Sequence, residues 1–142
     1  MGLFRVDFMR FVLDLDHKAI ADYTLEHSKT WDRYTTYHDR KLNDEWRKGI
    51  PGLQEFEQTL NDAADQFVER TGRRPFKGAQ GGHYLYYWAS VYRKHDQHGT
   101  HNHPNSLLAG TYYPLVGSES SPILLEAPWD SMIMHDLSLI HI

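Results

Sequence analysis

Hydrophobic positions repeat with a helical period in two stretches of the first half of the chain. The first follows Asp16, a residue type that caps helices by accepting hydrogen bonds from the backbone N–H groups of the first turn. Apolar residues then recur every three or four positions, as on one face of an α-helix. We interpret this stripe as core contact, with His27 packed within it; it consists of Ile20, Tyr23, His27, Trp31 and Tyr34.

The second helical stretch runs from about Leu53 to Arg70, and Gly72 suits its C-terminal end. The segment between the two predicted helices, residues 35–52, is polar and poorly periodic. Trp46 and Ile50 are its large apolar anchors, and no helix is assigned to it.

After Gly72 the pattern changes from helical to strand-like. Residues 83–94 are rich in Tyr, Trp and Val, which favour strands, and residues 107–113 and 122–127 form two further short runs. Looser alternation predicts an N-terminal strand within residues 3–15. The pattern therefore predicts an α+β fold in which N-terminal helices pack on an antiparallel sheet, a meander consistent with half a jelly roll.

Composition narrows the class of protein. The 142 residues suffice for one domain, and 40% hydrophobic with 24% charged residues is ordinary for a globular chain. The net charge of −4 argues against a general nucleic-acid or membrane-surface binder. Because the chain has no cysteine, any metal must be held by His and carboxylate side chains. Without a signal peptide or long apolar run, we expect a cytosolic protein.

Four of the ten histidines fall within nine residues, at His95, His98, His101 and His103. Residues i and i+2 of an extended backbone point to the same side, so His101 and His103 can share an ion. Neutral imidazole is a ligand suited to Fe, Zn, Cu and Ni. The spacing therefore predicts a metal site at His101 and His103, with His95 and His98 facing solvent. The alternative is a solvated histidine cluster.

The residues around this pair resemble a known family. The two segments concerned read Trp88-Ala-Ser-Val-Tyr-Arg-Lys and His101-Asn-His-Pro-Asn-Ser-Leu-Leu-Ala-Gly-Thr-Tyr-Tyr. They resemble the core of a family of 2-oxoglutarate/Fe(II)-dependent oxygenases that is common in marine phage and bacterial genomes and related to the prolyl-hydroxylase branch. The match covers about residues 84–128, with a looser match over the preceding helical part. Ala109 replaces the family's usual Ser, and His95 its usual Gly.

The resemblance implies a double-stranded β-helix, incomplete here, and the activity of a 2-oxoglutarate/Fe(II)-dependent dioxygenase. The family holds iron with a His-x-Asp/Glu motif and a distal His; His101 matches the first ligand, and His103 occupies the position of the acid. Asp96 is an alternative acid at the wrong spacing. Tyr113, with Tyr112 as its neighbouring candidate, resembles the strand tyrosine that binds the distal carboxylate of 2-oxoglutarate. Ordinary strand packing is the alternative for both tyrosines.

The expected organisation is one oxygenase-like domain, residues 1–135, and a non-native tail. Residues 136–142 resemble translated sequencing-adapter read-through at the end of a metagenomic reading frame. The distal His and the cosubstrate Arg are expected well beyond the third strand, where His135 lies too close and His141 falls in the tail. We therefore expect the full gene product to use Fe(II), 2-oxoglutarate and O₂, and this chain alone to bind Fe(II) weakly and be inactive. The sequence indicates no substrate and no further catalytic residue.

Two other functions compete with this one. One is a cupin-like metal- or small-molecule-binding module, and the other is a phage structural or interaction protein with a solvated histidine cluster. Cupins usually add a Glu a few residues after the histidine pair, whereas this chain has none between His103 and Glu119. This absence favours the oxygenase. No nucleic-acid or membrane partner is expected.

Overall fold

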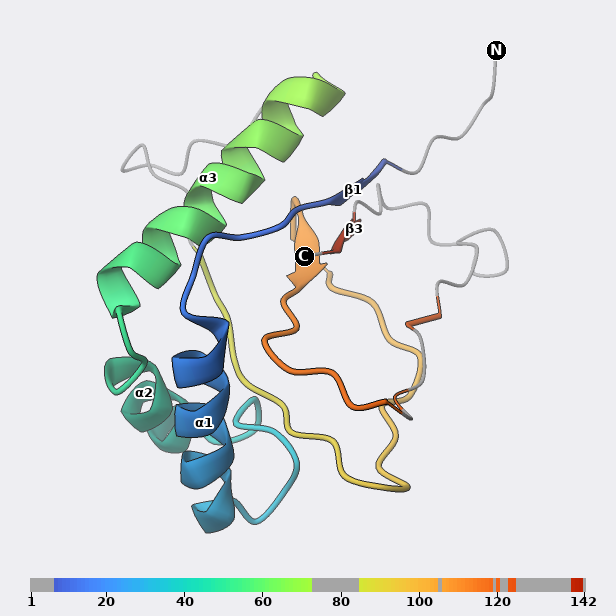
Figure 1. Cartoon of the computed structure of the whole chain (residues 1–142). Coiled ribbons are helices and arrows are strands. Elements are labelled where there is room, and N and C mark those ends of the chain that lie inside the picture. The colour runs from blue at the N-terminus through green and yellow to red at the C-terminus, as the bar shows by residue number, and fades with distance from the viewer. Residues whose placement is uncertain are drawn as a thin grey trace.

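Helices provide most of the regular structure of the chain (Figure 1). The computed structural model describes residues 7–72, 85–104, 106–118, 120, 123–124 and 139–141. The helical elements are α1 (His17–His27), the 3₁₀ helix η1 (Ser28–Thr30), α2 (Arg40–Lys48) and α3 (Leu53–Thr71). The strands have three residues each and are β1 (Phe8–Arg10), β2 (Ala109–Thr111) and β3 (Leu139–His141). Within the described part, no helix has the length and apolar character of a membrane span.

Helix α1 begins where the sequence predicts but ends earlier. Asp16 caps it, since its side chain accepts a hydrogen bond of 2.9 Å from the backbone N–H of Ala19. The hydroxyl of Ser28 donates to the carbonyl of Leu25 at 2.8 Å, a local bond that competes with continuation of the helix. The last members of the predicted stripe therefore lie outside the helix, and Trp31 has an extended backbone.

Helix α2 is an element that the hydrophobic pattern did not predict. Asp39 caps it by accepting a hydrogen bond of 3.0 Å from the backbone N–H of Leu42. Asn43 and Trp46 of the helix are buried, as is Ile50 just beyond its end, and the three have helical spacing. Because one of these three is polar, and the other residues of the helix are mostly charged, the periodicity of apolar residues does not reveal it.

Helix α3 confirms the second predicted helix. It extends one residue beyond Arg70, and Gly72 ends it with a φ of 68°, in the left-handed region that only glycine adopts readily. Its buried side chains recur at helical spacing; they are Phe56, Ala63, Phe67 and Val68.

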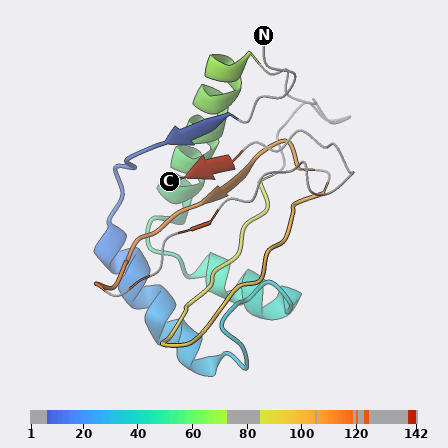
Figure 2. The same cartoon turned by 90° about the vertical axis from the view of Figure 1, so that its right-hand side faces the viewer.

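The predicted antiparallel jelly-roll sheet is wrong. Residues 85–94 contain no strand, residues 107–113 contribute only β2, and the described part of the N-terminal run contributes only β1. Moreover, the order is β1-β3-β2 and both pairings are parallel (Figure 2). Three strands of this length do not form half of a double-stranded β-helix. Of the third predicted strand, residues 123–124 are not in a strand, and residues 122 and 125–127 lie outside the described residues.

Residues 85–91 are held by residues 34–36 and by polar side chains instead of by a sheet. Ser90 forms an isolated antiparallel bridge with Thr35. The backbone N–H of Val91 donates to the carbonyl of Tyr34 at 2.7 Å, and that of Thr36 donates to the carbonyl of Ala89 at 3.0 Å. These bonds satisfy the backbone groups of the segment, which a strand ladder would otherwise have to pair.

The core joins this segment to all three α-helices. Its buried cluster comprises Ile20, Trp46, Ile50, Phe56 and Ala89. Half-buried aromatic side chains pack around it, among them Tyr87 and Tyr112. The core therefore fixes the position of the residues that precede the histidine cluster.

Candidate metal site

His101 and His103 lie together, as their spacing predicts. The Nε2 atom of His101 is 3.2 Å from the Nε2 atom of His103, and the ring centroids are 4.8 Å apart. His101 is exposed and His103 is half-buried. Two imidazole nitrogens at this separation and on the same side of the chain are the arrangement that a shared ion needs.

The carbonyl of Gly99 orients the first imidazole of the pair. The Nδ1 atom of His101 lies 3.0 Å from this carbonyl oxygen. A carbonyl oxygen only accepts hydrogen bonds, so Nδ1 carries the proton and donates it. In the neutral ring, Nε2 is then left with its lone pair and faces His103. Such a hydrogen bond fixes the tautomer of metal-binding histidines in general.

His103 lies in a more apolar environment than His101. The ring of Trp88 is beside it, with centroids 5.8 Å apart. Burial lowers the pKa of His103, and the nearby imidazoles of His101 and His98 lower it further. All three effects favour the neutral ring, which is the form that binds metal ions.

Trp88 reaches this position because the chain on both sides of it is anchored. The Nδ2 atom of Asn43 donates to the carbonyl of Tyr87 at 3.1 Å, and the backbone N–H of Ala89 donates to the hydroxyl of Thr36 at 3.1 Å. Helix α2 and residues 34–36 thereby set the backbone around Trp88. The candidate site therefore consists of two loop histidines, His101 and His103, and His103 contacts Trp88 in a segment that α2 and residues 34–36 hold in place.

A third metal ligand is not in place in the described part of the chain, where no three His, Asp or Glu side chains form a metal-holding group. Asp96, the alternative acid, is engaged in its own turn, because its Oδ2 accepts a hydrogen bond of 2.7 Å from the backbone N–H of Arg93. His135 lies outside the described residues, and of His141 only the backbone is described.

The two tyrosines predicted to bind 2-oxoglutarate have different surroundings. The hydroxyl oxygen of Tyr112 is 2.7 Å from Nδ1 of His17, and its ring lies 5.8 Å from that of Phe56 in the core. Burial raises the pKa of Tyr112 to about 12. Tyr113 is 40% exposed. Tyr112 is therefore placed as a packing residue with a hydrogen-bond partner, while Tyr113 faces outward.

His98 faces solvent, as the sequence predicts, and it also lies against the histidine pair. It is exposed, but its ring lies only 4.2 Å from that of His101, centroid to centroid. His98 lies three residues before His101, with Gly99 between them, and this spacing indicates a contact between the two rings only if the loop conformation is known. The tilted stacking arises because both rings turn toward the same carbonyl group.

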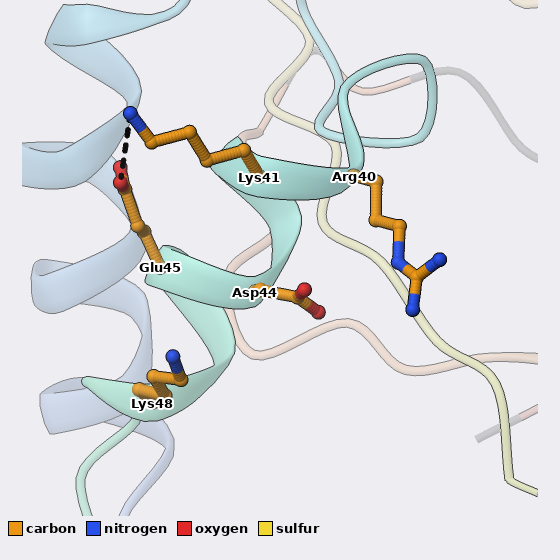
Figure 3. A pocket seen from close by; sticks show the side chains of 5 residues that line it. All are labelled: Arg40, Lys41, Asp44, Glu45 and Lys48. Carbon is orange, nitrogen blue, oxygen red and sulfur yellow. Dashed lines mark ion pairs between the residues drawn. The ribbon is translucent and has the colours of Figure 1, made fainter.

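A surface hollow lies on the exposed face of α2. It is lined by five charged side chains, Arg40, Lys41, Asp44, Glu45 and Lys48 (Figure 3). Lys41 and Glu45 form an ion pair of 3.9 Å across it. Exposed pairs of this kind contribute little, and charges of both signs alternate along the helix. The hollow is the solvent face of an amphipathic helix and offers no ligand-binding chemistry.

No protein-family model, no curated protein and no solved structure matches this chain.

Proposed function

We propose that His101 and His103 bind a divalent transition-metal ion and that the chain is the metal-binding part of a 2-oxoglutarate/Fe(II)-dependent dioxygenase. The observation that carries the proposal is the 3.2 Å separation of the two Nε2 atoms. The resemblance of residues 84–128 to that family supports the choice of iron and 2-oxoglutarate.

The nitrogen separation fits two adjacent ligands of one ion. Imidazole nitrogens bind metal ions at about 2.1 Å, and neighbouring ligands subtend about 90° to 110° at the metal. Two such nitrogens are then about 3.0 to 3.4 Å apart by trigonometry. The 3.2 Å between His101 and His103 falls within this interval. The pair therefore needs little rearrangement to receive an ion.

Iron and 2-oxoglutarate would supply the oxidising chemistry, and the protein residues would hold and shield them. His101 and His103 would bind the ion, the Gly99 carbonyl would keep the His101 ring in the required tautomer, and Trp88 would exclude water from one side of His103. A histidine at the position of the family's acid leaves the ion with more net positive charge. Tyr113 remains the candidate for the cosubstrate carboxylate.

Metal binding is tested by titrating the chain with Fe(II) without oxygen and measuring the heat of binding by calorimetry. We expect one ion per chain, and a loss of affinity of more than about tenfold in His101→Ala and in His103→Ala, because each removes a direct ligand. His38→Ala is the matched control, an exposed histidine outside the cluster. Equal affinity in all four proteins would show that the 3.2 Å contact is a hydrogen bond between two imidazoles and not a metal site.

The oxygenase assignment is tested separately by adding 2-oxoglutarate to the Fe(II) complex without oxygen. A 2-oxo acid that chelates Fe(II) produces a visible charge-transfer absorption, which we expect in the wild type and not in His101→Ala. Metal binding without this absorption would favour the alternative, a cupin-like metal-binding module. Absence of both would favour a structural or interaction protein.

A further inference from the structure

The carbonyl of Gly99 contacts two imidazoles, not one. The Nδ1 atom of His98 is 3.1 Å from this oxygen, and the Nδ1 atom of His101 is 3.0 Å from it. A carbonyl oxygen has two lone pairs, so it can accept from both rings at once. Each ring then carries its proton on Nδ1 and keeps the Nε2 lone pair available. The same backbone atom therefore prepares His98 and His101 for metal binding in the same way.

Aromatic rings hold His98 at this end of the cluster. Tyr34 lies edge-on to it with ring centroids 6.0 Å apart, and Tyr92 does the same at 6.4 Å. The two tyrosine rings also contact each other at 5.1 Å. The backbone bond from Val91 to Tyr34 fixes their relative position. His98 thus contacts aromatic rings, as His103 contacts Trp88.

We propose that His98 is the third protein ligand, so that one divalent first-row transition-metal ion is bound by the Nε2 atoms of His98, His101 and His103. This inference rests on the proposed function of the His101–His103 pair and adds the ligand that the pair lacks. The three rings already form a continuous series, with centroid separations of 4.2 Å and 4.8 Å. As they stand, the three side chains do not form a metal-holding group. The exposed His98 side chain would close the site by rotating away from Tyr34 and Tyr92, and exposed side chains rotate readily.

The proposed site has consequences for the kind of ion it takes. Three imidazoles from one loop, in the pattern His-x₂-His-x-His, form a neutral donor set that suits Zn²⁺ and its neighbours as well as Fe(II). It needs no carboxylate, so the replacement of the family's acid by His103 is compatible with a three-ligand site. Three protein ligands would leave coordination positions for water or a small ligand.

The experiment is a Zn²⁺ titration of the ¹⁵N-labelled chain, observed through the imidazole nitrogens. We expect the Nε2 resonances of all three histidines to shift at one equivalent of Zn²⁺. We expect His98→Ala to lower the Zn²⁺ affinity by more than about tenfold. His95→Asn is the matched control, because His95 lies in the same loop with a φ of 76°, which asparagine tolerates, and it should bind as the wild type does.

The outcomes separate this inference from the proposed function. If His98→Ala binds Zn²⁺ as tightly as the wild type while His101→Ala does not, the pair is a metal site and His98 is not its third ligand. If His101→Ala also binds normally, the metal site itself is absent. Far-UV circular dichroism checks the fold of each variant. Because His98 is exposed, its replacement by Ala should leave the fold intact.

Discussion

A single side chain, Tyr87, joins the core to a charged pair between α2 and α3. Its hydroxyl donates a hydrogen bond of 2.6 Å to Oε1 of Glu57, which also accepts one of 3.0 Å from Nη2 of Arg47. The Arg47 guanidinium lies 4.4 Å from the centre of the Tyr87 ring. The hydrogen bond from Tyr87, and then that from Arg47, lower the pKa of Glu57. Three residues from α2, α3 and the 85–91 segment thus stabilise one another.

Replacement of Tyr87 by Phe removes the hydroxyl and leaves the ring. We expect the free energy of unfolding at pH 7 to fall by about 1–2 kcal/mol, because Glu57 loses one charge-assisted hydrogen bond but keeps Arg47 and solvent. Urea denaturation followed by tryptophan fluorescence measures the change. Tyr86→Phe is the control, since Tyr86 is 46% exposed. A similar loss in both variants would contradict this account.

Tyr87 also makes the free energy of unfolding depend on pH in the alkaline range. Burial, and then the hydrogen bond to Glu57, raise the pKa of Tyr87 from 10.0 to about 12. Between these values the unfolded chain has lost the proton that the folded protein still binds. The contribution of Tyr87 is therefore complete below pH 10 and declines as the pH rises toward 12. In Tyr87→Phe the free energy of unfolding should fall less steeply between pH 10 and 12, although Tyr112 still contributes a decline. The same steepness in the variant and the wild type would contradict the role given to Tyr87.

At the scale of elements, α2 is held in place by a polar contact and not by apolar surface alone. Asn43 is only 3% exposed and makes two hydrogen bonds, accepting one of 2.6 Å from the Thr36 hydroxyl and donating one of 3.1 Å to the Tyr87 carbonyl. Thr36 in turn accepts from the backbone of Ala89. This network connects α2 to the segment that carries Trp88, and through it to the histidine pair.

Replacement of Asn43 by Ala leaves the Thr36 hydroxyl and the Tyr87 carbonyl without these buried partners. We expect a loss of about 2–3 kcal/mol in the free energy of unfolding, the usual cost of unsatisfied buried groups. Lys41→Ala, on the exposed face of the same helix, should change it by less than about 0.5 kcal/mol. Chemical denaturation compares the two, and equal effects would show that the network contributes nothing specific.

At the scale of the whole molecule, one cluster connects helices distant in sequence with the irregular second half. Phe56 of α3 is 4% exposed and lies 5.5 Å from the ring of Tyr87 and 5.8 Å from that of Tyr112. It therefore touches both long loop segments that flank the candidate metal site. The strands, by contrast, have three residues each, and β1 and β2 contain no buried residue.

Replacement of Phe56 by Ala should cost about 3–5 kcal/mol, the range for removing a buried aromatic ring. Thermal and urea denaturation measure the loss, and Phe56→Leu, which leaves a smaller cavity, keeps the effect measurable if the Ala variant does not fold. Val12→Ala is the control, because Val12 is 90% exposed. A small loss in Phe56→Ala would mean that the aromatic cluster is not the core.

Local features of the sequence determined the parts of this protein that depend on neighbouring residues. Asp16 marked the start of α1, and Gly72 and the apolar periodicity marked α3, because caps and helical faces act within a few residues. The spacing of His101 and His103 predicted that their nitrogens lie close together, because side chains two residues apart share one side of an extended chain.

The tertiary structure alone decided the remainder. Helix α2 has a polar residue on its buried face, so no apolar pattern marks it. The aromatic run at 85–94 has the composition of a strand, but partners distant in sequence, Thr35, Thr36 and Asn43, satisfy its backbone in another way. His98 and Trp88 join the histidine pair only through the loop conformation and the core that anchors it. Pairing between segments far apart in the chain depends on long-range contacts, which residue spacing does not encode.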